Sequence, residues 1–217
     1  MRNNFENKLE ELNSNLVSMG EMVNQSLSYA LEALNSKDTS HIDFVLQQEP
    51  EINQFCSEIE SEALLLLLKE QPLARDFRFV SAAIRMNTDM ERIGDQAEDI
   101  AVLVKQMLNF GYKQRSLGSL TKMSEITQTM VSNAVRAFVE GDSELAYEAA
   151  QMDDEVDALF IKVREEVIND IRTETIDANL AIDLLMISKY LERSADHAQN
   201  IAEAVVYSIT GAVEKFD

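Results

Sequence analysis

Apolar residues recur at spacings of three and four along almost the whole chain. This is the period of amphipathic α-helices, and the breaks in it contain residues that commonly begin or end helices. We therefore predict an all-α fold with six long helices, at about residues 4–35, 39–69, 75–109, 117–140, 143–171 and 175–209. The composition agrees, because 6 Gly and 2 Pro in 217 residues are too few for the many turns of a sandwich or barrel.

The predicted helix boundaries carry recognisable turn chemistry. Residues 37–40 and 140–143 offer Asp, Ser and Thr side chains for N-caps, and Pro72 interrupts the second helix pattern. The longest connector is 109–119, near the middle of the chain. Pro50 lies within the second helix pattern, so we expect either a kink or a late helix start there.

The chain contains an internal duplication. The segment 91–101 (ERIGDQAEDIA) aligns with 192–202 (ERSADHAQNIA), which follows it by 101 residues. A second match joins 49–53 to 153–157, 104 residues later. Two matches in the same order and at nearly equal offsets indicate two structural repeats.

The third predicted helix indicates how each repeat packs. Its apolar residues alternate spacings of four and three, the pattern of near-antiparallel helix packing. One helix cannot bury such a seam alone, so we predict two tandem three-helix bundles, residues 1–110 and 111–217. The seam consists of Phe79, Ala83, Met86, Met90, Ile93, Ala97, Ile100 and Val104.

Four aligned segments each place an acidic residue four positions before Asp or Asn. Residues at i and i+4 lie on one helix face, so both oxygen-bearing side chains project together. If two such faces converge in each bundle, they could surround a cation, because hard cations and iron take oxygen ligands. The alternative is a solvated acidic face. The pairs are Glu49/Asn53, Glu91/Asp95, Asp153/Asp157 and Glu192/Asp196, and Asp99 and Asn200 extend the pattern as secondary candidates.

The charge balance restricts the possible partners. With 39 acidic and 19 basic residues the net charge is −20, which disfavours nucleic acids and anionic membranes. A basic protein surface or a metal cation suits this chain better. The longest apolar run, 63–68, is too short to span a bilayer, and the N-terminal residues lack the apolar core of a signal peptide. We therefore expect a cytoplasmic protein without membrane insertion.

The sequence offers little to support catalysis. Neither His41 nor His197 follows a Glu by three residues, so a ferritin-like di-iron site is not expected. Ser194, Asp196 and His197 share one helix without a nucleophile elbow. Cys56 lies near an apolar stripe, which favours a packed thiol over a reactive one. We predict that the protein is not an enzyme.

Several of these segments resemble the PhoU family of bacterial phosphate-transport regulators, and the resemblance extends over nearly the whole chain. The motifs that carry it are Met19-Gly20, QPLARDFR at 71–78, ERIGD at 91–95 and ERSADHAQNIA at 192–202.

The resemblance implies two three-helix bundles with metal sites on their surfaces. The ions would be divalent or trivalent (iron, zinc, manganese or magnesium), singly or in multinuclear clusters. The ligands would be Glu91/Asp95 and Glu192/Asp196, with Glu49/Asn53 and Asp153/Asp157 as their partners. Three departures stand out: Asn53 replaces a frequent acid, Cys56 occupies a position that is acidic in some relatives, and Ser194-Ala195 replaces Ile-Gly. Since an amide brings no charge, we expect the N-terminal site to bind metal more weakly or to hold fewer ions.

The resemblance also implies a function. Family members are negative regulators of phosphate uptake and phosphate-responsive signalling. This chain would then be a metal-binding adaptor between the phosphate ABC transporter ATPase subunit and its sensor histidine kinase, and a homodimer. Two alternatives stay open: a metal-handling or metal-sensing helical protein without a phosphate-specific role, and a structural adaptor without bound ions.

Overall fold

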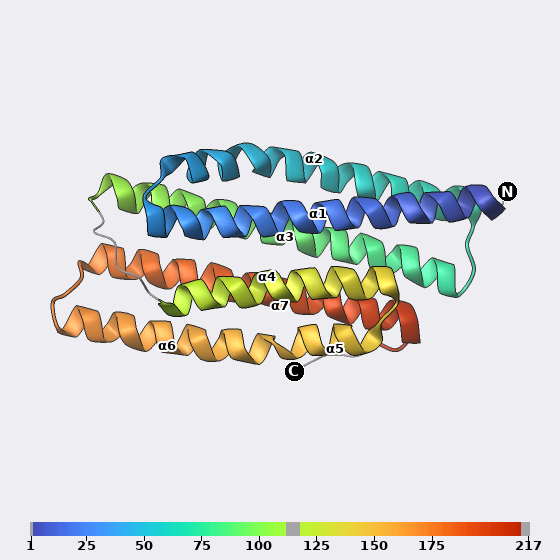
Figure 1. Ribbon diagram of the computed structural model, residues 1–217. Helices are drawn as coiled ribbons and strands as arrows, with labels where there is room; N and C mark the ends of the chain where they lie inside the picture. The colour runs from blue at the N-terminus through green and yellow to red at the C-terminus, as the bar shows by residue number, and fades with distance from the viewer. Residues whose placement is uncertain (1, 112–117, 214–217) are drawn as a thin grey trace.

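Long helices lying side by side form the whole described structure (Figure 1). The computed structural model describes residues 2–111 and 118–213, and within them there is no β-strand, which confirms the all-α prediction. The helices are α1 (Arg2–Ser36), α2 (Thr39–Glu70), α3 (Arg75–Asn109), α4 (Gly118–Glu140), α5 (Ser143–Gln151), α6 (Asp153–Arg172) and α7 (Ala178–Thr210).

Aspartate residues are the N-caps of three of these helices. Asp38 caps α2 by accepting a hydrogen bond from the backbone N–H of Ser40 (2.9 Å). Asp142 caps α5 in the same way, and Asp177 caps α7 through the N–H of Asn179 (2.9 Å). Each cap satisfies a backbone donor that has no partner within its helix. The predicted breaks at 37–40 and 140–143 are thereby confirmed.

Three details of the predicted helices are wrong. The expected helix 143–171 is divided at Met152 into α5 and α6, and Asp153, Asp154 and Glu155 form the first turn of α6. Negative charge at a helix N-terminus is favourable, which supports a new start there. The last helix begins at residue 178 rather than 175, because Asp177 caps it. A late start at Pro50 is also wrong, since α2 already begins at Thr39.

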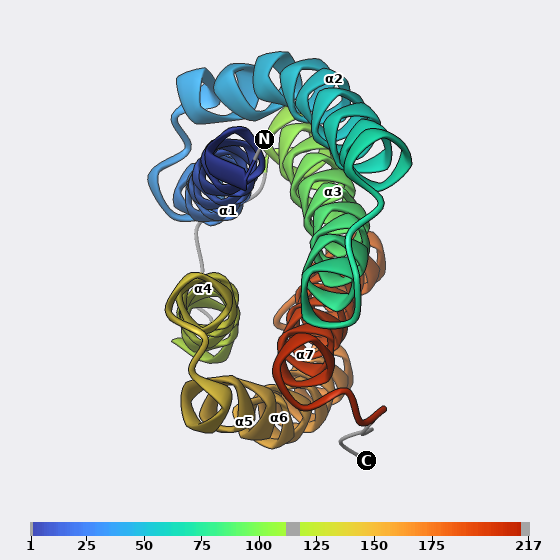
Figure 2. The ribbon, with the colours of Figure 1, turned by 90° about the vertical axis from the view of Figure 1, so that its right-hand side faces the viewer.

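The helices form two tandem bundles, which we call the first repeat (α1–α3) and the second repeat (α4–α7). In the end-on view of Figure 2, α1 faces α4 and α3 faces α7, while α2 and the pair α5–α6 lie on opposite outer edges. The predicted boundary between 110 and 111 follows the end of α3. Most of the predicted connector 109–119 lies outside the described residues.

The predicted seam of α3 packs into the core that the helices share. Seven of its eight residues are completely buried. The eighth, Phe79, is partly buried and stacks on Phe138 of α4 with ring centroids 4.4 Å apart. Gly94 lies where a Cβ atom would be 3.1 Å from Cγ2 of Ile52, so the close approach of α2 explains this glycine. Within residues 2–111 and 118–213, none of the helices combines the length and apolar content that a bilayer span requires.

Candidate metal centres

Four carboxylates of the second repeat lie together where α6 and α7 pack, and we call them the α6–α7 cluster. Asp153 and Asp157 come from α6, and Glu192 and Asp196 come from α7. Burial, followed by the negative charges of Asp196, Asp157 and Glu192, raises the pKa of Asp153 to about 7. The two acidic pairs therefore lie close enough for their charges to interact.

The α6–α7 cluster holds more negative charge than its basic neighbours balance. Burial raises the pKa of Asp157 and of Asp196, and the charge of Glu192 raises both further. Lys189 donates a hydrogen bond to Glu192, and its Nζ lies 5.5 Å from the ring centroid of Phe160. The buried Oδ1 of Asp153 has no hydrogen-bond partner. A buried acceptor without a donor is costly, and a cation could satisfy it.

The corresponding side chains of the first repeat form the α2–α3 cluster: Glu49 and Asn53 from α2, and Glu91 and Asp95 from α3. Burial raises the pKa of Glu91, and the charges of Asp95 and Glu49 raise it further. Asn53 donates a hydrogen bond from its Nδ2 to Glu49. Its buried Oδ1 has no hydrogen-bond partner. The two predicted pairs therefore converge in this repeat as well.

Arg92 partly neutralises the α2–α3 cluster. Its Nη1 donates to Oδ2 of Asp95 at 2.9 Å, and its Nε lies 3.4 Å from Oε2 of Glu91. Three carboxylates and one amide here correspond to four carboxylates in the α6–α7 cluster. Both clusters offer oxygen donors of the kind that hard cations prefer, and the α6–α7 cluster offers more negative charge.

Asp99 and Asn200 have partners across the contact between α3 and α7. Asp99 forms a hydrogen bond with Tyr190 and interacts electrostatically with the positive charge of Arg193. Asn200 donates to Oδ1 of Asp89 at 3.4 Å. Both side chains therefore face the other repeat. Their role as metal ligands stays a prediction.

Sequence reasoning missed a polar contact between the repeats. Nδ1 of His197 lies 2.9 Å from Oδ1 of Asp89, and both side chains are largely buried. The contact joins residues 108 positions apart in the chain. The duplication could have indicated it only if the antiparallel pairing of α3 with α7 had also been known.

Glu98 was also missed. Burial raises its pKa, followed by the charges of Glu49, Asp99 and Asp95, so it borders the α2–α3 cluster. It lies seven residues after Glu91, a spacing that returns to the same helix face. That spacing is the signal that could have found it.

Cys56 lies beside the α2–α3 cluster as a protonated thiol. Burial, and then the charges of Glu91 and Glu60, raise its pKa to about 11. Nδ2 of Asn87 donates to its sulfur at 3.1 Å. Because only the thiolate is a strong nucleophile, this environment agrees with the predicted packed thiol.

The clusters remain candidates. Within residues 2–111 and 118–213, no three His, Cys, Asp or Glu side chains are arranged as a bound metal ion would need. The acidic side chains of each cluster lie close together, but metal binding stays a prediction.

Comparison with known proteins agrees with the duplicated architecture. The family model of the PhoU domain matches the chain twice, at residues 16–104 and 120–205, once in each repeat. The phosphate-specific transport system accessory protein PhoU homolog of Clostridium acetobutylicum is 32% identical over 208 residues, which cover 95% of this chain and 94% of that protein. The PhoU homolog 1 of Thermotoga maritima is 33% identical over 95% of this chain and 89% of its own length.

Two solved structures share the whole fold. The crystal structure of PhoU from Pseudomonas aeruginosa superposes with a TM-score of 0.90 at 30% identity, covering 96% of this chain and all of that chain. The phosphate transport system regulatory protein PhoU from Streptococcus pneumoniae superposes with a TM-score of 0.89 at 30% identity, covering 98% of this chain and all of that chain. With its sequence and its fold matched over both repeats, the chain belongs to the PhoU family.

Proposed function

We propose that the chain is a negative regulator of phosphate uptake and of phosphate-responsive signalling. It acts in the cytoplasm as an adaptor between the ATPase subunit of the phosphate ABC transporter and the sensor histidine kinase. The observation that carries the proposal is the end-to-end similarity, across both repeats, to proteins named as accessory or regulatory proteins of phosphate transport. Such a protein acts through contacts, so no catalytic step is assigned to it.

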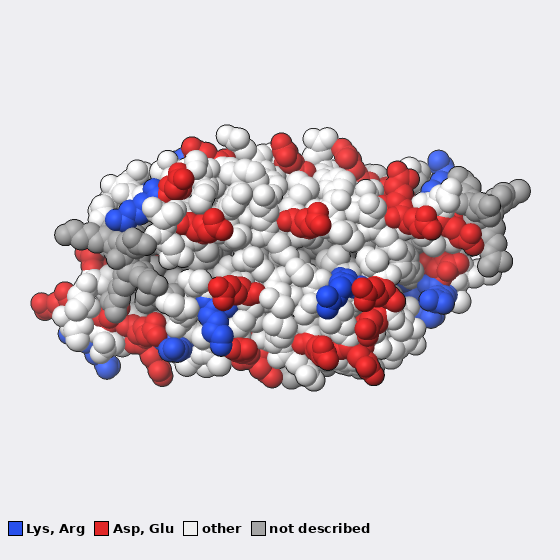
Figure 3. Space-filling view, in the orientation of Figure 1, with Lys and Arg blue, Asp and Glu red and all other residues white. Residues whose placement is uncertain are grey.

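The surface fits a role based on contacts. Acidic side chains are spread over both repeats on the face drawn in Figure 3, with fewer basic side chains between them. Charge of one sign steers association with oppositely charged partners and discriminates against like-charged ones. Assembly into a homodimer belongs to the same proposal, and light scattering measures it directly.

The second part of the proposal is that both clusters bind divalent or trivalent cations in a structural or regulatory role. What supports it is the collection of like charges on facing helices and the partly buried Asp153, whose Oδ1 has no donor. A cation would neutralise the repulsion, and the side chains would have to turn to reach it. Because the α6–α7 cluster has the extra carboxylate, we expect it to bind more tightly.

A deletion strain tests the regulatory part. We expect that its phosphate uptake and phosphate-responsive transcription stay high when phosphate is plentiful, and that the wild-type gene restores repression. Normal uptake and transcription in the deletion strain would contradict the proposal. Metal-dependent transcription that changes in the deletion strain, with phosphate responses intact, would instead favour the metal-sensing alternative.

A further inference from the structure

Three leucines on the outer face of α2 are exposed to solvent. Leu64, Leu65 and Leu68 have relative exposures of 50%, 48% and 73%, and we call them the α2 ridge. Positions 64 and 68 are one helical turn apart, so their side chains lie in line along the helix. Neighbouring exposed apolar side chains offer a surface that a partner can cover.

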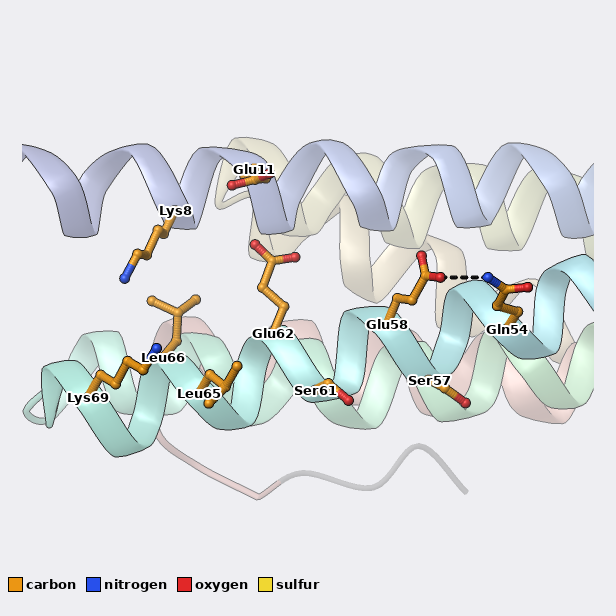
Figure 4. A pocket seen from close by; sticks show the side chains of 10 residues that line it. All are labelled: Lys8, Glu11, Gln54, Ser57, Glu58, Ser61, Glu62, Leu65, Leu66 and Lys69. Carbon is orange, nitrogen blue, oxygen red and sulfur yellow. Dashed lines mark hydrogen bonds between the residues drawn. The ribbon is translucent and has the colours of Figure 1, made fainter.

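Carboxylates lie on both sides of the α2 ridge. On the side of α1, a groove of about 570 Å³ runs between the two helices, and Glu58, Glu62 and Glu11 line it (Figure 4). In Figure 4, Glu62 extends from α2 across the groove towards Glu11. By helical geometry, Glu60 lies on the opposite side of the ridge, and it is exposed.

The glutamates of the groove could bind a cationic side chain. Two lysines line the groove beside its glutamates: Lys8, whose Nζ lies 3.0 Å from Oε1 of Glu70, and Lys69 of α2. Glu62 accepts a hydrogen bond from Asn15 (3.0 Å), and burial and the charge of Glu11 nevertheless raise its pKa. A lysine or arginine placed between Glu11 and Glu62 would relieve that repulsion.

The second repeat shows that the fold does not require acids at the positions of Glu58 and Glu60. The offset of 104 residues that joins Glu49 to Asp153 keeps α2 and α6 in register, because Ile59 and its match Val163 are both buried. On the outer face, Leu64 corresponds to Ile168, which is also exposed. Two flanking charges are reversed, because Lys162 and Arg164 of α6 stand at the positions of Glu58 and Glu60. Glu166 keeps the acid of Glu62, and Arg172 stands at the position of Leu68.

We propose that the α2 ridge and the adjoining groove dock a basic amphipathic helix of a partner protein. The apolar face of that helix covers Leu64, Leu65 and Leu68, and its flanking lysines or arginines meet the glutamates of α1 and α2. Two antiparallel helices with a groove between them form the shape that an amphipathic helix occupies. The inference rests on the proposed adaptor function and assigns it a surface.

The test measures binding of the full chain to two purified proteins, the phosphate transporter ATPase subunit and the cytoplasmic part of the sensor kinase. One variant removes the apolar face (Leu64→Ser with Leu68→Ser), and another reverses the flank (Glu58→Lys with Glu60→Lys). The matched controls change α6: Ile168→Ser, and Lys162→Glu with Arg164→Glu. Because all of these side chains are exposed, circular dichroism should show unchanged helical content.

We expect both α2 variants to weaken binding of one of the two proteins by roughly tenfold or more, and the α6 controls to change it by less than about twofold. Wild-type binding that the α2 variants leave unchanged would overturn this inference and leave the proposed function standing. A wild-type chain that binds neither protein would count against the proposed function itself. Light scattering tests whether a second copy of the chain occupies the surface instead. In that case glutamates of α2 in one copy would meet basic residues of α6 in the other, and both the α2 and the α6 charge reversals would abolish self-association. That result would overturn the proposal.

Discussion

Replacing Asp153 with Asn in the metal-free protein should remove the pH dependence that this residue contributes to stability. Asp153 stands in the first turn of α6 among three other carboxylates, and its pKa rises from an ordinary 3.8 to about 7. Between those values the folded chain binds a proton that the unfolded chain has released. The free energy of unfolding therefore falls as the pH rises from about 4 to 7, and the Asp153 contribution is most unfavourable above about 7.

The magnitude follows from the two pKa values. A change from 3.8 to about 7 corresponds to about 4 kcal/mol if the side chain were fully shielded from water. Asp153 is only partly buried, so solvent screens the repulsion, and we expect about 1–2 kcal/mol. Asn keeps the size of the side chain and removes its charge.

Urea unfolding in the presence of a chelator at pH 5.5 and pH 8 measures the effect. We expect Asp153→Asn to be more stable than the wild type by about 1–2 kcal/mol at pH 8 and by about half of that at pH 5.5. Asp154→Asn, an exposed neighbour in the same turn, is the matched control and should change the difference between the two pH values much less. A variant that is equally stable or less stable than the wild type at pH 8 would refute the assigned repulsion.

Three further predictions concern the clusters and the helix contacts. Asp95→Asn and Asp196→Asn should each lower the metal content measured by elemental analysis of protein purified without added metal, with helical content unchanged; full metal content in both variants would contradict the assigned ligands. Gly94→Val should destabilise the fold by about 2 kcal/mol, because a Cβ there would already be 3.1 Å from Ile52, whereas Gly118→Val, with no atom within 4 Å, should be nearly neutral in thermal unfolding. His197→Ala should cost about 1–2 kcal/mol by leaving Asp89 without its 2.9 Å partner, and a double-mutant cycle with Asp89→Ala that shows no coupling would rule this contact out as a source of stability.

Local signals in the sequence predicted most of the helix boundaries and the core. Asp38 and Asp142 act within two or three residues, so their capping role is visible without the tertiary structure. The seam of α3 is likewise encoded by spacing alone. The helix break at Met152 was not predicted, because the apolar period continues across it, although the chain starts a new helix there.

The acidic clusters were predictable for a different reason. The duplication places equivalent pairs on two helices of each repeat, and neighbouring helices in a small bundle must face one another. The contact of Asp89 with His197 depends instead on how α3 crosses α7, which no local pattern specifies. The change from Glu58 and Glu60 in α2 to Lys162 and Arg164 in α6 can be interpreted only after the structure shows which positions point outwards.

Diffraction from crystals grown with Mn²⁺, measured with anomalous scattering, tests the central claim most directly. We expect anomalous peaks at both clusters, between Asp153, Asp157, Glu192 and Asp196 in the second repeat and beside Glu49, Glu91 and Asp95 in the first, with the stronger peak in the second repeat. Well-ordered carboxylates without a peak at either cluster would show that these convergent acids do not hold a cation.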